Sequence, residues 1–135
     1  MGIERVIVLD TNVLSDLMRP MPSAAVLAWA RAQDAGQMFT TAVCEAELLF
    51  GIAAMAVGRR RTTLTRAVEA ILGTVLQGRV LPFDRAAARV YGALAAAGRR
   101  SGRPVGLSDL KIAAIARARD ADAIATRNIG HFVDC

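Results

Sequence analysis

The sequence is poor in lysine, histidine, cysteine and aromatic residues, and the scarcity of cysteine excludes two classes of protein. Its two cysteines, Cys44 and Cys135, are too few for a disulfide scaffold and lack the spacing of a zinc site. A reducing, cytoplasmic setting is therefore expected. No stretch approaches the roughly 18 uncharged residues of a membrane helix. Glu4 and Arg5 stand where a signal peptide would become apolar, so we expect neither export nor a membrane partner.

The rest of the composition is typical of a compact globule. Apolar residues make up 54% of the 135 residues and charged residues 21%, which favours a packed core in one domain over disorder. The net charge of +5 is carried almost wholly by arginine, since Lys111 is the only lysine. The planar guanidinium suits phosphate groups. The charge alone leaves open either a nucleic-acid-binding surface or the solvated surface of an arginine-rich protein.

Short apolar runs alternate with amphipathic helical segments along the chain. Strands are expected over residues 3–9, 37–40, 79–83 and 123–126. Helices are expected after residue 10 and over residues 24–34, 42–57, 59–76, 85–100 and 109–119, with N-caps at Ser23, Thr41, Asp84 and Ser108. This alternation predicts an α/β fold in which helices flank a parallel sheet of about four strands.

Three acidic residues lie where a parallel sheet would bring them to one rim. Asp10 ends the first apolar run, Glu47 lies inside an otherwise apolar helix, and Asp109 begins the last predicted helix. Ligands of open α/β sheets bind at the carboxyl ends of the strands, and three carboxylates there make a site for a hard metal ion. Taken singly, Asp10 also fits a helix cap and Asp109 a first-turn acid. Glu45 points about 200° away from Glu47 on a helix, so the two do not face one site.

Five segments in order then resemble one family. They are residues 8–15 (VLDTNVLS), 40–51 (TTAVCEAELLFG), 78–84 (GRVLPFD), 109–116 (DLKIAAIA) and 125–128 (ATRN). In this order and spacing the chain resembles a PIN-domain ribonuclease, specifically a VapC-type toxin of the FitB-like branch. The resemblance spans almost the whole chain and implies one three-layer PIN domain over residues 1–135.

The resemblance also implies a catalytic metal centre for Mg²⁺ or Mn²⁺. Asp10, Glu47 and Asp109 match the metal-binding acids of the family, and Asn128 would act on the metal through a water molecule. Three further residues would hold these ligand side chains in place without binding the metal themselves: Thr11, Asn12 and Thr126. A metal-activated water would then hydrolyse RNA and leave a 5′-phosphate.

Partners follow from the same resemblance. The RNA substrate is expected to be structured, with tRNA as the example. Residues expected to contact it are Arg59, Arg60, Arg99, Arg100, Arg103, Arg127 and His131. The chain would be the toxin of a type II toxin–antitoxin system, paired with a small DNA-binding antitoxin of the VapB or FitA type. Homodimers are expected through helix faces around residues 91–97 and at Leu48, Leu49 and Ile52, and toxin–antitoxin hetero-oligomers beside them.

The sequence departs from the family pattern at its C-terminal end. Asn128 and His131 stand where many relatives carry acids, which favours one well-bound metal over two. The chain stops at Cys135, so the last edge strand of the family fold is expected to be missing.

Of three other functions, two conflict with the sequence and one stays open. A phosphatase of the haloacid dehalogenase type has a second aspartate where Asn12 stands, and a P-loop enzyme needs a glycine-rich phosphate loop that is missing here. A non-catalytic or silenced FitB-like partner of a DNA-binding antitoxin, within a transcription-regulating complex, remains open.

Overall fold

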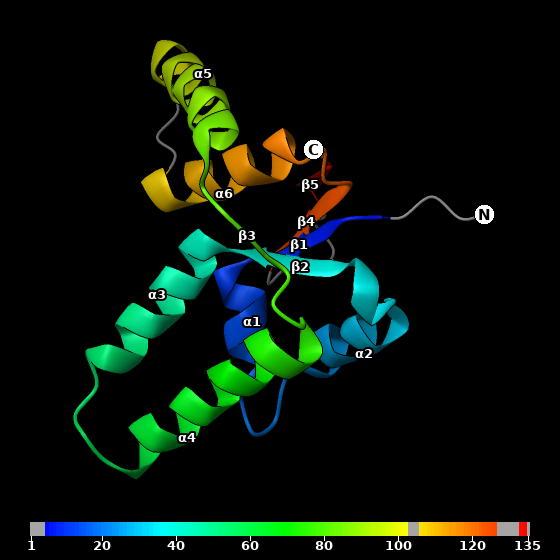
Figure 1. Ribbon diagram of the computed structural model, residues 1–135, viewed down its shortest axis with the longest axis vertical. Helices are drawn as coiled ribbons and strands as arrows, with labels where there is room; N and C mark the ends of the chain where they lie inside the picture. Colours follow the sequence, from blue (N-terminus) through cyan, green and yellow to red (C-terminus); the bar gives the residue numbers. More distant parts are fainter. Residues whose placement is uncertain (1–4, 103–105, 127–132, 135) are drawn as a thin grey trace.

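The computed structural model describes residues 5–102, 106–126 and 133–134. Its described part has a five-stranded sheet with helices on both sides (Figure 1). In chain order the elements are β1 (Ile7–Leu9), α1 (Thr11–Leu17), α2 (Ala24–Ala32), the 3₁₀ turn η1 (Ala35–Gln37), β2 (Met38–Thr41), α3 (Ala42–Ala53), α4 (Arg59–Glu69), the π-helical segment η2 (Ala70–Val75), β3 (Val80–Leu81), α5 (Arg85–Ser101), α6 (Leu107–Ala118), β4 (Ala123–Ala125) and β5 (Val133–Asp134). The predicted α/β fold with a four-stranded parallel sheet is confirmed.

The strand order is β3-β2-β1-β4-β5. The first four strands are parallel to their neighbours, whereas β5 runs antiparallel to β4. The expectation that the C-terminal edge strand is missing is therefore wrong. Val133 pairs with Ile124 and Asp134 with Ala123, and this pairing satisfies backbone groups that an open edge of β4 would leave without partners.

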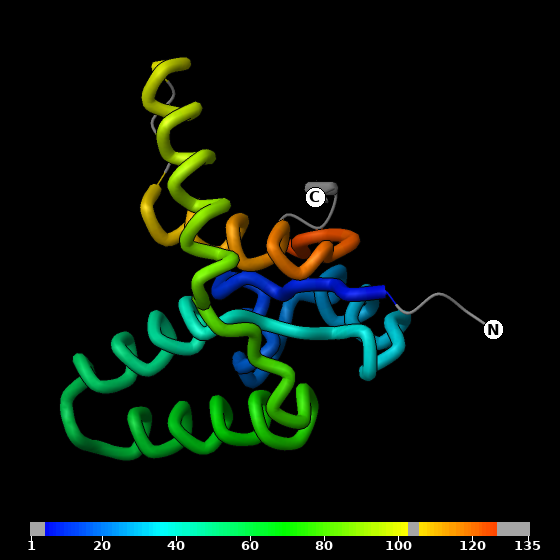
Figure 2. The backbone as a smooth tube through the Cα atoms, turned by 45° about the horizontal axis from the view of Figure 1, so that its top comes forward, coloured from blue at the N-terminus to red at the C-terminus, as the bar shows by residue number. Residues whose placement is uncertain are grey.

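Helices cover both faces of the sheet. Figures 1 and 2 show α6 on one side and α1, α2 and α4 on the other, while α5 rises away from the body next to α6. All three residues of β1 are buried, as are Ile112 and Ile115 of α6 and Val13 and Leu14 of α1. Burial from both sides explains why the strands are unbroken apolar runs in the sequence. None of the described helices is long and apolar enough to cross a membrane.

Two of the four predicted N-caps bond their helices as expected. The Thr41 hydroxyl accepts a hydrogen bond from the Cys44 N–H at 3.1 Å, and the Asp84 carboxylate accepts one from the Ala87 N–H at 2.9 Å. Ser23 occupies the N-cap position of α2, but its side chain makes no capping bond. The cap at Ser108 is wrong.

The helix α6 begins two residues before the predicted start. Its N-cap is Gly106, because the Leu110 N–H bonds the Gly106 carbonyl at 3.0 Å and closes the first turn there. This earlier start puts Asp109 inside the first turn, where the helix dipole favours an acid.

Several other predicted elements are shorter than expected, among them the helix over residues 42–57, which ends at Ala53. The third strand is limited to Val80–Leu81, since Pro82 has no N–H to give to a neighbouring strand. The helix predicted over residues 59–76 changes at Ala70 from α to π geometry.

The strand order creates a switch point beside β1. From β1 the chain moves to β2 and β3 on one side, and it later returns to β4 on the other side. Open α/β sheets bind ligands at the carboxyl ends of the strands at such a point. Leu9 and Ala125 are paired at the ends of β1 and β4, so Asp10 and Thr126 both follow directly at this position.

Candidate active site

Asp10 is fixed at the switch point by two hydrogen bonds. Its N–H donates to the Ala125 carbonyl at 3.1 Å, which ties it to β4. Its Oδ1 accepts the Val13 N–H at 2.9 Å and so caps α1. Asp10 therefore has two roles. One of its carboxylate oxygens caps α1, and the residue lies at the edge of the sheet where ligands are expected to bind.

The electrostatic surroundings of Asp10 are unfavourable for its charge. Burial raises the pKa of the Asp10 carboxyl above its usual value, and the charges of Asp109 and Glu47 raise it further. Hydrogen bonds from the N–H groups of Val13 and Asn12 lower the pKa, and they offset only part of the rise. Both other acids thus lie within electrostatic reach of Asp10.

Glu47 is connected to the same turn by a side-chain hydrogen bond. It lies on α3, and its Oε1 accepts the Thr11 hydroxyl at 2.6 Å. Thr11 directly follows Asp10, so this bond holds the Glu47 carboxylate beside the switch point.

Asp109 completes the predicted triad from α6. It is exposed in the first turn of that helix. A Cβ added at Gly106 would lie 3.5 Å from its Oδ2, so the carboxylate folds back over the start of its own helix.

The three carboxylates fit a divalent metal in kind but are not gathered around one point. All are hard oxygen donors, and no arginine or lysine of the described residues forms an ion pair with them. Within residues 5–102, 106–126 and 133–134, however, no three acidic, histidine or cysteine side chains form a group able to hold one ion.

The supporting residues have mixed positions. Asn12 is exposed on the first turn of α1, and Thr126 is half-buried after β4. Asn128 and His131 lie outside the described residues, as do Arg103 and Arg127.

Of the remaining predicted RNA contacts, Arg59 and Arg60 are exposed in the first turn of α4. Arg99 and Arg100 are exposed in the last turn of α5, which Figure 1 shows far along the projecting end of that helix. The two arginine pairs thus belong to different regions of the molecule.

Two cavities meet at Glu47. One, of about 460 Å³, lies among α1, α3 and α4 and includes Thr11, Glu47 and Arg60 in its lining. The other, of about 410 Å³, lies between α3 and α6 and includes Glu47, Phe50 and Lys111. Sequence reasoning did not single out Phe50 or Lys111, although each lies two or three residues after a predicted acid.

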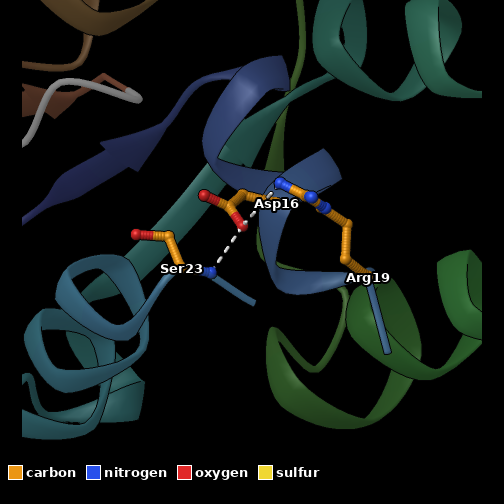
Figure 3. Close-up of polar contacts among 3 residues, drawn as sticks. All are labelled: Asp16, Arg19 and Ser23. Carbon is orange, nitrogen blue, oxygen red and sulfur yellow. Dashed lines mark hydrogen bonds and ion pairs between the residues drawn. The ribbon is translucent and has the colours of Figure 1, made fainter. Parts of the chain in front are cut away.

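A buried carboxylate shapes the first cavity. The Asp16 side chain is 3% exposed, and it accepts the Ser23 N–H at 2.9 Å and lies 3.9 Å from the Arg19 guanidinium (Figure 3). These contacts fix the turn between α1 and α2. The same region also holds Leu48 and Ile52, which are buried in the core, so the prediction that these two residues form a dimer surface is wrong, whereas the third predicted residue, Leu49, is exposed.

The fold and the site define an α/β protein with carboxylates at the switch point of a parallel sheet. Comparison with known proteins then identifies the family. The family model of the PIN domain matches residues 7–132, and the chain belongs to the PIN-domain family.

Similar proteins are VapC- and FitB-type toxins. The chain is 45% identical over 126 residues to the VapC ribonuclease Y4jK of Sinorhizobium fredii, covering 93% of this chain and 89% of that protein. It is 32% identical to the toxin FitB of Neisseria gonorrhoeae, covering 93% and 90%. The crystal structure of FitAcB from Neisseria gonorrhoeae superposes with a TM-score of 0.81 at 32% identity, covering 93% of this chain and 89% of that one.

Proposed function

We propose that the chain is a metal-dependent endoribonuclease, the toxin of a type II toxin–antitoxin system, and that it is one PIN domain working in the cytoplasm. The observation that carries the proposal is the position of Asp10 at the switch point, half-buried beside the charges of Glu47 and Asp109 without a neutralising side chain among the described residues. Such a carboxylate group is stabilised by a bound cation. The name of the relative from Sinorhizobium fredii, a ribonuclease, supports the reaction.

Asp10, Glu47 and Asp109 would hold Mg²⁺ or Mn²⁺, with Asn128 acting through a water molecule. When bound, the ion would supply a water of lowered pKa and offset charge on the phosphate. The Val13 N–H fixes one oxygen of Asp10, and the Thr11 hydroxyl fixes one of Glu47. These contacts hold the carboxylates of Asp10 and Glu47 beside the switch point.

The RNA is proposed to be a structured molecule such as a tRNA. Arg60 is the predicted RNA contact best placed near the acids, because it lines a cavity that also contains Glu47. Arg99 and Arg100 would reach only a substrate that extends along α5.

A small antitoxin is the proposed protein partner. Three solved relatives support this partner. They are the structures of FitAcB, of FitAB bound to a DNA fragment, and of VapBC-1 from nontypeable Haemophilus influenzae, the last at 27% identity and a TM-score of 0.72. We assign the antitoxin's apolar side chains to the cavity among α1, α3 and α4, whose lining includes the half-buried Met55 and Leu64. An arginine from the antitoxin would meet the carboxylates in place of the metal.

Homodimers are proposed through α5. Its face around Tyr91 and Leu94 is only half-buried in the isolated chain, and Ala93 and Ala96 are exposed. Small exposed residues on a projecting helix permit close approach of a second copy. Light scattering at micromolar concentration should give the mass of a dimer, and a strictly monomeric mass would contradict this assignment.

A cleavage assay on the free protein tests the nuclease. With Mg²⁺ or Mn²⁺, a mixture of labelled tRNAs should be cut, and EDTA should stop the reaction. Asp109→Asn and Glu47→Gln should lower the rate by at least about 100-fold. Glu45→Gln is the matched control on the same helix, since Glu45 is predicted to face away, and it should leave the rate within twofold.

One competing function has its own support. The structure of FitAB bound to a DNA fragment, 31% identical to this chain, favours a role as partner of a DNA-binding antitoxin. Full cleavage by the wild type in EDTA, or by the Asp109→Asn variant, would contradict the assignment of a metal to these carboxylates. Absence of cleavage under every metal, together with operator binding by the toxin–antitoxin complex, would favour the non-catalytic alternative.

A further inference from the structure

The cavity between α3 and α6 combines chemical groups that suit one nucleotide. Its lining is Ala42, Val43, Ala46, Glu47, Phe50, Ser108 and Lys111. On α3, positions 43, 46, 47 and 50 follow the spacing of one helix face, and positions 108 and 111 do the same on α6. The two faces therefore meet across the cavity, with Glu47 of the candidate active site in its wall.

Phe50 gives this cavity an aromatic surface that nothing in the described structure occupies. The residue is 75% exposed. Phe83, by comparison, is in edge contact with Tyr91, at 6.0 Å between ring centroids. Within the described residues Phe50 has no such ring contact, so its face is free for a flat ligand.

Lys111 gives the same cavity a positive charge. It is half-buried, and its ammonium forms no ion pair with any carboxylate among the described residues. An ammonium without an acidic partner at the edge of a carboxylate site suits a phosphate. Ser108, one helical turn before it, adds a hydroxyl that can donate to or accept from a ribose or phosphate oxygen.

We propose that this cavity is a subsite for one unpaired nucleotide of the RNA, with the base stacked on Phe50 and a neighbouring phosphate bound by Lys111. The volume of about 410 Å³ falls within the range of small-ligand sites. Base stacking on an aromatic side chain requires a base released from its helix. The proposal rests on the proposed ribonuclease function and adds to it: cleavage falls in an unpaired loop or end of the structured RNA.

Binding without metal tests the subsite independently of cleavage. The probe is a fluorescein-labelled single-stranded RNA of about eight nucleotides, within the usual site size of such proteins, titrated with wild-type protein in EDTA. Its affinity is followed by fluorescence anisotropy at several salt concentrations. A blunt RNA duplex of the same sequence is the second probe.

Phe50→Ala should weaken single-strand binding by about tenfold and leave duplex binding within twofold. Phe50→Trp should retain the affinity. Leu49→Ala is the matched control, since Leu49 is 49% exposed on the same helix but does not line the cavity. It should stay within twofold of wild type.

Lys111→Met should weaken binding and reduce the slope of log affinity against log salt by about 0.7, the loss of one phosphate contact to a single strand. Arg117→Met on the same helix lines a different cavity and is the control for lost charge. It should change the slope less.

Three results would overturn the subsite. The first is equal affinity of Phe50→Ala and Leu49→Ala for the single strand, and the second is an equal loss for the duplex. The third is unchanged RNA affinity with a changed oligomeric mass in Phe50→Ala, which would assign the cavity to a protein contact. If wild-type protein cleaves RNA but these variants bind normally, only the subsite fails. If it neither binds nor cleaves RNA, the proposed function fails with it.

Discussion

Replacing Asp10 by asparagine separates the two roles of this residue. The asparagine side-chain oxygen can still accept the Val13 N–H, since asparagine caps helices about as well as aspartate. The substitution removes the charge that burial, Asp109 and Glu47 disfavour. Asp10→Asn should therefore abolish cleavage while raising the stability of the metal-free protein at neutral pH.

The sign follows from the pKa of Asp10, which is higher in the folded than in the unfolded chain. The folded state then binds the proton more tightly, so stability falls as pH rises from the ordinary pKa through the raised one. Above this window the ionised carboxylate keeps destabilising the fold. The advantage of Asp10→Asn should thus be present at pH 7, shrink as the pH falls through the raised pKa, and be lost at or below the ordinary pKa of aspartate.

A second variant supplies the magnitude. Asp10→Ala loses the 2.9 Å capping bond to Val13, a loss of about 1 kcal/mol. For a chain of 135 residues this corresponds to a melting temperature about 4 °C below that of Asp10→Asn. Thermal unfolding in EDTA measures both variants beside the wild type at pH 7 and at pH 3.5.

Added metal should reverse the order. Mn²⁺ at about 100 times its dissociation constant stabilises the wild type by about 2.7 kcal/mol, and Asp10→Asn should gain much less. If Asp10→Asn melts well below wild type in EDTA at pH 7, the carboxylate is not strained by its neighbours. Asp10 would then not belong to a carboxylate group that needs a bound cation.

Two further variants test contacts beside the site. Thr11→Val removes the hydroxyl that donates to Glu47 at 2.6 Å, so kcat/KM for RNA should fall by about tenfold. Thr11→Ser should restore most of the activity. Equal rates in Thr11→Val and the wild type would show that this bond does not position Glu47. Asp16→Ala leaves the Ser23 N–H without its carboxylate acceptor and should lower the free energy of unfolding by about 1–3 kcal/mol in urea titrations. Asp16→Asn should lower this free energy by less. An unchanged urea midpoint for Asp16→Ala would contradict the role of this bond in fixing the turn.

Local sequence signals predicted what depends on neighbouring residues. The cap at Thr41 is confirmed because the hydroxyl and the N–H that it bonds lie three residues apart. The position of Asp10 is local in the same way, because it directly follows the apolar run of β1. The start of α6 was missed because Gly106 carries no side-chain capping signal.

Contacts between distant elements were beyond local signals. The cavity containing Phe50 and Lys111 exists only because α3 packs against α6, and no periodicity within either helix reports that packing. Leu48 and Ile52 were read as partner-facing for the same reason, whereas α1 and α4 cover them within the chain. The edge strand β5 depends on backbone pairing with β4, and the residue types at Val133 and Asp134 do not predict this pairing.

The strand order also sets the time at which activity can arise during synthesis. The first strand of the chain is central in the sheet, and one of its neighbours, β4, is made more than a hundred residues later. Until Ala123–Ala125 has left the ribosome, the N–H of Asp10 has no Ala125 carbonyl to bond and one side of β1 lies open. A nascent or prematurely ended chain would therefore carry all three acids without a sheet to bring them together. The nuclease proposed above would therefore gain its site only when synthesis of the chain is nearly complete.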